Sequence, residues 1–184
     1  MSRKQSITKE MLLEAAFTIV KDRGKDELSA RNLAGQCGCS TQPIFRIYSG
    51  MGELEHELFE KCIDFFSDFY KKCPETENVP FVNLGLAYIK FASEYPNLFR
   101  LLFIDGANSV MSMYDLINGG KNNFVIHEIK KIPDISTDEA GVIFMRIWIF
   151  IHGMACMVIR DDFDMSQDEI RDLLISTYNA FKER

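Results

Sequence analysis

Residues 29–48 most constrain what this chain of 184 residues can fold into, because two short helical patterns meet there at a glycine. Ser29 can accept from a free backbone N–H two or three residues later and so predicts the start of the first helix. Gly38 predicts its end, since glycine tolerates the left-handed conformation that closes a helix. Ser40 is expected to cap a second helix whose first turn contains Pro43, where a missing N–H has no helical partner to lose. Two short helices joined by such a turn form a helix-turn-helix.

The second of these helices carries polar side chains that suit base recognition. Ile44, Phe45 and Tyr48 are expected to anchor it against its neighbours. The residues left facing outward are Thr41, Gln42 and Arg46. Glutamine pairs with adenine, arginine with guanine, and a threonine methyl group contacts thymine, so this face predicts a recognition helix. A solvated helical hairpin without a role in DNA binding is the alternative.

A preceding helix over residues 8–23 completes a three-helix head. Thr8 predicts its N-cap and Gly24 its end, and its apolar positions recur at steps of three and four residues. Packed across the hairpin, it is expected to bury Phe17 together with Leu33 and Phe45. The tail before it holds Lys4, which can reach a DNA phosphate.

The charge is distributed unevenly along the chain. The formal net charge is −6, yet residues 1–50 carry eight Lys and Arg against five Asp and Glu. The rest carries thirteen against twenty-two. A basic head on an acidic body predicts that DNA is approached by one end of the protein.

The remaining sequence predicts a helical body. A long helix over 53–72 is expected to join the head to it without a flexible linker, and the pattern at 81–92 is apolar on nearly every face, which predicts a central helix. A short apolar helix over 98–103 follows. The region 105–131 is divided by Gly119 and Gly120 into two further helical patterns.

Residues 140–159 are almost entirely apolar and follow a capping box formed by Ser136 and Glu139. The run has the length of a membrane span. Arg146 within it opposes that interpretation, because a central arginine costs about 2.5–3.5 kcal/mol on insertion scales. We expect instead a helix buried on one side by its own body and on the other by a partner subunit, with Gly153 and Ala155 allowing a close approach.

A last amphipathic helix begins at a second capping box, Ser166 with Glu169. An amphipathic helix beside an over-hydrophobic one predicts a four-helix interface in a two-fold homodimer. The residues expected to bury against their symmetry mates are Gly153, Ile170, Leu174, Tyr178 and Phe181.

Catalytic and cofactor motifs are missing from the sequence. The five cysteines are scattered and odd in number, which favours reduced thiols in a cytoplasmic protein, and no Cys or His spacing predicts a metal site. No glycine-rich phosphate loop follows a strand. We therefore expect neither an enzyme nor a cofactor.

The motifs together resemble the TetR family of bacterial transcription regulators. The head motifs are Gly24, Leu28-Ser29-x-Arg31-x-Leu33-Ala34, Cys39-Ser40, Ile44-Phe45-Arg46-Ile47-Tyr48 and Leu54. The body carries Phe91-x-x-Glu94-x-Pro96-x-Leu98-Phe99-Arg100 and Trp148-x-x-x-His152-Gly153, which are similar to the family's Trp-His-Gly type of C-terminal domain. Four positions depart from the family pattern, namely Phe45, Ile47, Tyr48 and Met51. Two of them concern phosphate contacts, since Phe45 stands where a tyrosine usually meets a phosphate and Met51 where a lysine does.

The resemblance implies an all-α homodimeric repressor, with a DNA-binding domain at 1–50 and a ligand-binding and dimerisation domain at 51–184. It implies a palindromic double-stranded operator and release by a small apolar or aromatic effector. The DNA-binding residues expected are Lys4, Ser29, Arg31, Ser40, Thr41, Gln42, Arg46 and Tyr48. The ligand-binding residues expected are Tyr88, Phe91, Phe103, Met113, Trp148 and His152, any of which can equally be a core residue. The alternative function is a helical dimeric ligand-binding or adaptor protein without specific DNA binding.

Overall fold

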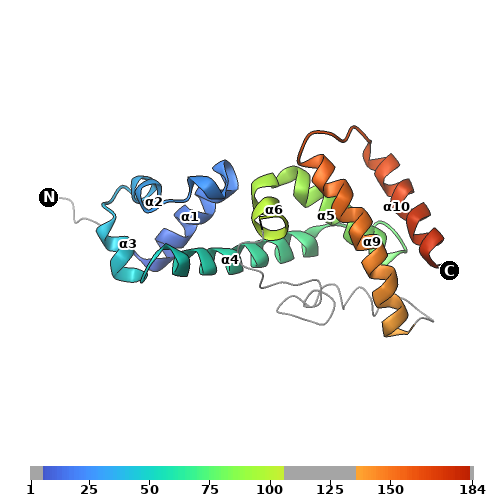
Figure 1. Ribbon diagram of the computed structural model, residues 1–184, viewed down its shortest axis with the longest axis horizontal. Helices are drawn as coiled ribbons and strands as arrows, with labels where there is room; N and C mark the ends of the chain where they lie inside the picture. Colours follow the sequence, from blue (N-terminus) through green and yellow to red (C-terminus); the bar gives the residue numbers. More distant parts are fainter. Residues whose placement is uncertain (1–5, 106–135, 183–184) are drawn as a thin grey trace. The chain divides into compact units, whose positions relative to one another are not determined.

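The computed structural model describes residues 6–105 and 136–182, and all regular elements in these ranges are helices (Figure 1). The predicted all-α fold class is therefore confirmed. The elements are α1 (Lys9–Arg23), the short 3-10 helix η1 (Lys25–Glu27), α2 (Ala30–Gln36), α3 (Gln42–Ile47), α4 (Met51–Lys72), α5 (Pro80–Glu94), α6 (Pro96–Phe103), α9 (Thr137–Val158) and α10 (Gln167–Lys182). The two helical patterns predicted around Gly119 and Gly120 lie outside the described residues.

The chain forms two compact units. We call residues 1–65 with 95–108 the head unit, and residues 66–94 with 109–184 the body unit. α4 therefore contributes residues to both. The predicted boundary at residue 50 separates a DNA-binding domain from a ligand-binding and dimerisation domain. This division by function stays a prediction.

In the head unit, α1 packs against α2 and α6 (Figure 1). α1 begins where the Thr8 side chain accepts from the N–H of Met11, and it ends at Gly24, whose φ of 91° suits glycine. Beside this end, the Asn97 amide of α6 donates to the Lys21 carbonyl over 3.0 Å. These contacts hold α6 on the C-terminal end of α1. α6 therefore belongs to the head unit although it lies far from the helix-turn-helix in the sequence.

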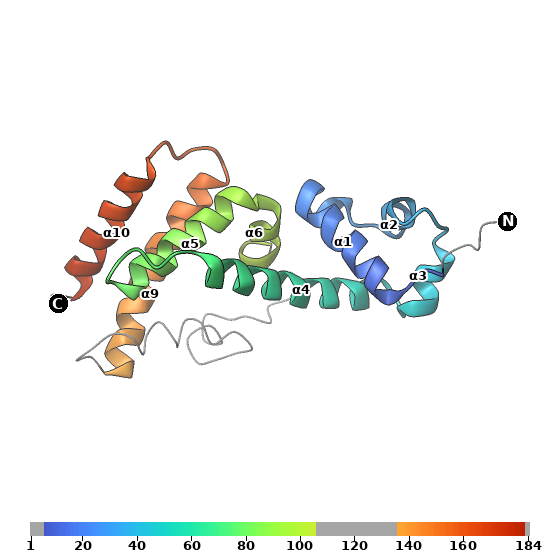
Figure 2. The same ribbon diagram turned by 180° about the vertical axis from the view of Figure 1, so that it is seen from behind.

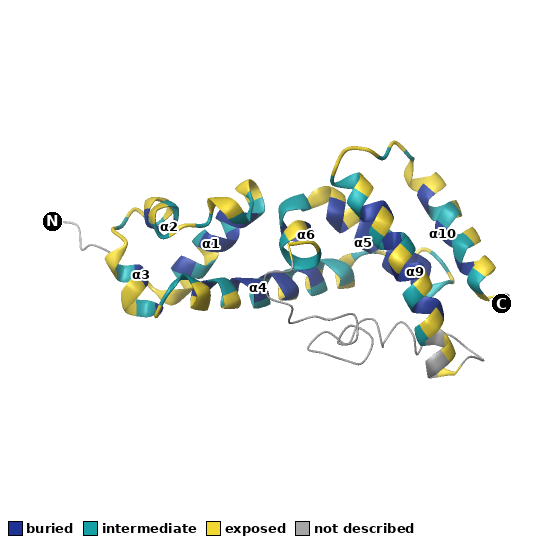
Figure 3. Cartoon of the chain, viewed as in Figure 1, coloured by how far each residue is buried: buried dark blue, intermediate teal, exposed yellow. Residues whose placement is uncertain are grey.

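In the body unit, α5 is the central helix and packs against both α9 and α10 (Figure 2). Its residues are buried on nearly every face, which confirms the prediction from its sequence (Figure 3). Gly85 permits the close packing, because a Cβ built there would lie 2.8 Å from Ile151 Cδ1 and 3.0 Å from Leu174 Cδ1. The glycine is needed here for space and not for an unusual backbone angle.

Both predicted capping boxes are present. Ser136 and Glu139 exchange backbone–side-chain hydrogen bonds at the start of α9, and Ser166 and Glu169 do so before α10. In each box the serine hydroxyl also donates to the glutamate carboxylate. This bond is the largest cause that lowers the pKa of both glutamates, and the bond from the serine backbone N–H is the next. The two helices therefore start where local sequence dictates.

α9 is the one described helix that is long and apolar enough to cross a membrane by length and composition. One side of it is core, since Phe144, Ile147 and Ile151 are buried and the helix packs against α5 and α10. The opposite side exposes large apolar side chains. This division matches the expectation of a helix with one side buried within its own body.

The predicted dimer face of α10 is wrong in most of its residues. Ile170, Leu174 and Tyr178 are buried within the protomer itself, with Leu174 only 2% exposed. The Tyr178 ring meets Phe81 of α5 at 6.1 Å. Because α5 and α9 already cover this face, it is not available to a second copy. Phe181 is half-buried, and the guanidinium carbon of Arg146 lies 5.9 Å from the centre of its ring.

Candidate functional site

The helix-turn-helix is held by bonds that the turn itself supplies. The Ser29 side chain accepts from the N–H of Asn32, which confirms it as the cap of α2. Gly38 has a φ of 62°, and its N–H donates to Gly35 while that of Cys39 donates to Ala34. These two bonds satisfy two of the last carbonyls of α2 and form a Schellman motif, so the turn to α3 has a defined geometry.

α3 starts one residue later than a cap at Ser40 requires. Its N-cap is Thr41, and no side chain makes a cap bond there, so the predicted Ser40 cap is wrong. Pro43 lies within the first turn, as predicted. Its fixed φ and missing N–H suit that position, which explains how a six-residue helix starts without a capping side chain.

The polar residues predicted to read bases lie on the surface of α3. Thr41, Gln42 and Arg46 are all exposed. Ile44 on the opposite side is completely buried and fixes the helix on the head unit. The outward position of the three polar side chains is the geometry that base recognition needs.

Phe45 is not an anchor of α3, because its side chain is 53% exposed. It follows Ile44 directly, so it points about 100° away from the buried side of the helix. A helix of six residues has room for few inward positions, and here Ile44 occupies the inward one. Phe45 therefore adds an apolar group to the exposed face.

Tyr48 lies in the core of the head unit and is 1% exposed. Its hydroxyl donates to the Glu57 carboxylate over 3.1 Å, and Glu57 also pairs with Lys9. Burial raises the pKa of the Tyr48 hydroxyl, with the Glu57 bond as a further cause. The prediction that Tyr48 contacts DNA does not fit this location.

The other predicted DNA-binding residues are distributed at the start of the two helices. Arg31 and Ser40 are exposed, and Ser29 is exposed as well while capping α2. Lys4 lies outside the described residues. These DNA contacts stay predictions.

In the body unit, three of the predicted ligand-binding residues meet in one cluster. Tyr88 of α5 and Trp148 of α9 have ring centroids 4.7 Å apart, and the His152 ring stacks on Trp148 with 15° between the planes. Tyr88 Oη and His152 Nδ1 are hydrogen-bonded at 2.9 Å. Burial raises the pKa of Tyr88 well above its ordinary value and lowers that of His152.

Of the other three predicted ligand-binding residues, two have other ring partners and one lies outside the described residues. Phe91 packs against the rings of Phe66 and Phe69 on α4. Phe103 belongs to the head unit, where it contacts Phe99. Met113 lies outside the described residues.

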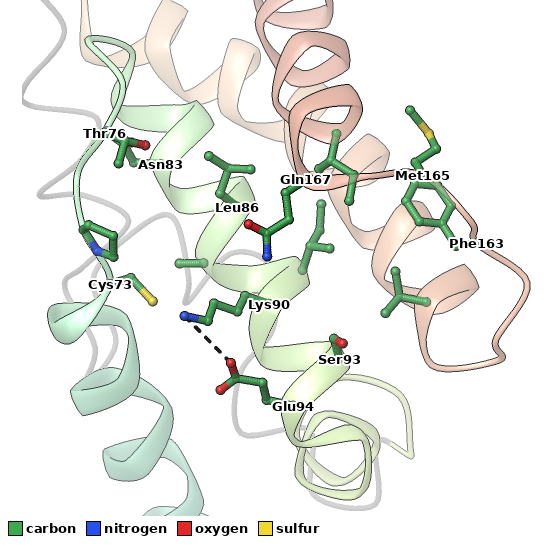
Figure 4. A pocket seen from close by; sticks show the side chains of 15 residues that line it. Cys73, Thr76, Asn83, Leu86, Lys90, Ser93, Glu94, Phe163, Met165 and Gln167 are labelled. Carbon is green, nitrogen blue, oxygen red and sulfur yellow. Dashed lines mark ion pairs between the residues drawn. The ribbon is translucent and has the colours of Figure 1, made fainter.

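A separate pocket of about 420 Å³ opens in the body unit beside α5 (Figure 4). Its walls come from the segment after α4, from α5, and from the segment between α9 and α10 with the start of α10. Lys90 and Gln167 point into the space, and Lys90 pairs with Glu94 at 3.7 Å (Figure 4). Most of the remaining lining is apolar, and the volume is in the range of small-molecule sites.

No motif in the sequence predicts this pocket, and none of the predicted ligand-binding residues lines it. It arises from the spacing of α5 and α10 and not from a motif. Within the described residues, no group of three or more His, Cys, Asp and Glu side chains is placed to hold a metal ion.

A second feature is the exposed side of α9, a helix whose sequence predicts that a partner subunit covers one of its sides. We call this exposed side the α9 apolar stripe; its apolar members are Val142, Ile149, Gly153 and Met157, and the exposed Arg146 lies between the first two. Ile149 is 66% exposed. Of the predicted dimer residues, Gly153 lies in this stripe, and nothing lies within 4 Å of a Cβ built on it.

Comparison with known proteins supports the fold. No family model matches the chain, and no curated protein sequence matches it significantly. The structure is similar to the crystal structure of a TetR-like transcriptional regulator from Rhodococcus sp. RHA1, with a TM-score of 0.64 over 96% of each chain at 14% sequence identity. The chain therefore has the fold of a TetR-like transcriptional regulator.

Proposed function

We propose that this protein is a transcription regulator that binds double-stranded operator DNA as a homodimer and releases it when a small molecule binds the body unit. The observation that carries this proposal is the exposed polar face of α3. Gln42 and Arg46 point outward from a helix that Ile44 fixes in place. That arrangement presents hydrogen-bonding groups to a major groove without further rearrangement.

The charge of the chain supports DNA binding by the head. Residues 1–50 are net basic within a chain whose net charge is −6. Neutralisation of phosphates by Lys and Arg supplies most sequence-independent affinity, and repulsion from the acidic remainder would orient the approach.

The α9 apolar stripe is our proposed dimer interface, in place of the buried face of α10. Exposed apolar side chains along one helix suit a self-complementary contact across a two-fold axis. Gly153 would let the two helices approach closely. In such a dimer the two α3 helices would enter successive major grooves, about 34–36 Å apart.

The effector would be a small apolar or aromatic molecule. The cluster of Tyr88, Trp148 and His152 offers aromatic surface with two polar atoms, and the pocket beside Lys90 offers a second, largely apolar space. Because α4 contributes residues to both units, we take it as the route by which a bound effector would affect the head.

Trp148 is the single tryptophan of the chain, so its fluorescence can separate the two effector sites. An effector in the cluster should change this emission, and His152→Ala should weaken its binding. An effector in the pocket should leave the emission nearly unchanged and should lose affinity in Lys90→Ala.

DNA binding is tested by selecting bound duplexes from a random pool with the purified full-length protein. The proposal expects enrichment of a two-fold symmetric motif with half-sites about one helical turn apart. A pool that stays unenriched while the protein is folded and dimeric would favour the adaptor function instead.

A further inference from the structure

Tyr88, His152 and Cys156 form a chain of three polar groups across α5 and α9. Cys156 Sγ lies 3.6 Å from His152 Nε2, and His152 Nδ1 lies 2.9 Å from Tyr88 Oη. We propose that Cys156 is a site of covalent modification by soft carbon electrophiles such as α,β-unsaturated carbonyl compounds. His152 acts as its base, and Tyr88 is a positioning residue for His152.

The geometry is that of an activated nucleophile. Activation requires a nucleophile within hydrogen-bond reach of a base, and a third group that orients the base. His152 and Cys156 are four residues apart on α9, which places them on the same side of the helix. The stacked Trp148 ring and the Tyr88 hydroxyl restrain the imidazole from its other sides.

The protonation states suit proton transfer from the thiol. Burial raises the pKa of Tyr88 well above its ordinary value, so the phenol stays neutral. Burial lowers the pKa of His152, so its imidazole is neutral at pH 7. When Nδ1–H donates to Tyr88 Oη, the nitrogen facing Cys156 is the unprotonated Nε2, which can accept the thiol proton.

The reaction balances without any oxidant or reductant. Nε2 takes the proton from Cys156, and the thiolate sulfur attacks the β-carbon of the electron-poor double bond. A carbon–sulfur bond forms as the carbon–carbon π bond opens toward the carbonyl group. The imidazolium then returns its proton to the α-carbon, which leaves a neutral thioether and a neutral histidine.

Cys156 differs from the other thiols of the chain. All five cysteines lie in the described residues, and Cys156 is the one with a nitrogen of a described histidine within hydrogen-bond distance. Burial raises the pKa of Cys62 to about 12 and also raises that of Cys37 and Cys73. A higher pKa leaves less reactive thiolate, so these three thiols serve as internal controls. Cys156 is half-buried, whereas Cys62 is buried.

The test is a time course of labelling by N-ethylmaleimide at pH 7 on the full-length protein, followed by peptide mass spectrometry of all the cysteines. Cys156 should react at least about tenfold faster than Cys73, a modest share of what a positioned base contributes. His152→Gln should lower the Cys156 rate to about that of Cys73. The Cys73 and Cys37 rates should not change, which controls for folding of the variant.

The role of Tyr88 has its own readout. Tyr88→Phe keeps the ring and removes the acceptor for Nδ1–H. It should therefore slow the labelling of Cys156 and shift the ¹⁵N resonances of His152 toward those of the other tautomer. In guanidinium chloride Cys156 and Cys73 should be labelled at about the same rate, because the faster labelling of Cys156 depends on the fold.

Two results would overturn the proposal. One is equal labelling of Cys156 and Cys73 in the native protein, and the other is an unchanged Cys156 rate in a folded His152→Gln variant. The labelling is measured without DNA, so its outcome does not depend on the proposed regulatory function.

Discussion

If the α9 apolar stripe is the dimer interface, replacing Ile149 with Asp should separate the protomers without unfolding them. Ile149 is 66% exposed, so the change removes few contacts inside the protomer. Full burial of an isoleucine contributes about 1.5–3 kcal/mol, and two thirds of this is about 1–2 kcal/mol. A two-fold interface contains the side chain twice, which gives about 2–4 kcal/mol of dimer stability.

A loss of this size raises the dimer dissociation constant by about 30- to 1000-fold. The unpaired carboxylates add to the effect, because a buried charge without a partner is strongly unfavourable. Sedimentation velocity over a concentration series measures the constant, and circular dichroism verifies that helix content is retained. Ile149→Leu is the matched control and should stay dimeric.

Leu174→Ala separates the interface from the core. Leu174 is 2% exposed inside the protomer, so its truncation should reduce the free energy of unfolding by about 2–5 kcal/mol. It should not selectively weaken the dimer. If Ile149→Asp dimerised as tightly as the wild type, the stripe would not be the interface.

Two further outcomes concern stability. Asn83→Ala removes both hydrogen bonds that its amide makes to the backbone of Glu77, at 3.0 and 2.7 Å, and should lower the free energy of unfolding in urea by about 1–3 kcal/mol. Asn179→Ala, at an exposed position, is its control. Equal stability of the two variants would show that the hydrogen bonds between Asn83 and Glu77 do not stabilise the fold. Because burial lowers the pKa of His152, the unfolded state binds its proton more readily, so stability should fall as the pH drops below about 6.5. A folded His152→Gln variant should lose less stability between pH 7 and 5, and an identical pH dependence would contradict this.

Helix boundaries were predictable where the determining contacts are local. Thr8 and Ser29 cap the helices that begin directly after them, and Gly24 ends α1 with the positive φ expected of glycine. Each of these signals depends on residues within one turn of the boundary, so the sequence contains the whole cause. Ser40 is not the cap of α3, because the helix begins one residue later, after Thr41.

The partner of an apolar face could not be predicted in the same way. Leu174 and Tyr178 recur at helical spacing, which indicates a buried side but not whether the covering helix belongs to the same chain. Ile149 lies in a run that is apolar all round, so its exposure depends on where α5 and α10 pack. The pocket beside Lys90 likewise follows from helix spacing.

The proposed reading of bases by α3 is tested most directly by comparing Gln42→Ala with the wild type, on a selected operator and on operators changed at each position. Gln42 is exposed on the outward face of α3, so we expect its loss to reduce affinity for the operator by about 1–3 kcal/mol. We also expect the preference to relax at one position in each half-site, while the other positions keep theirs. An equal loss of affinity on all sequences would show that Gln42 contacts the DNA backbone, and would contradict the proposed orientation of α3.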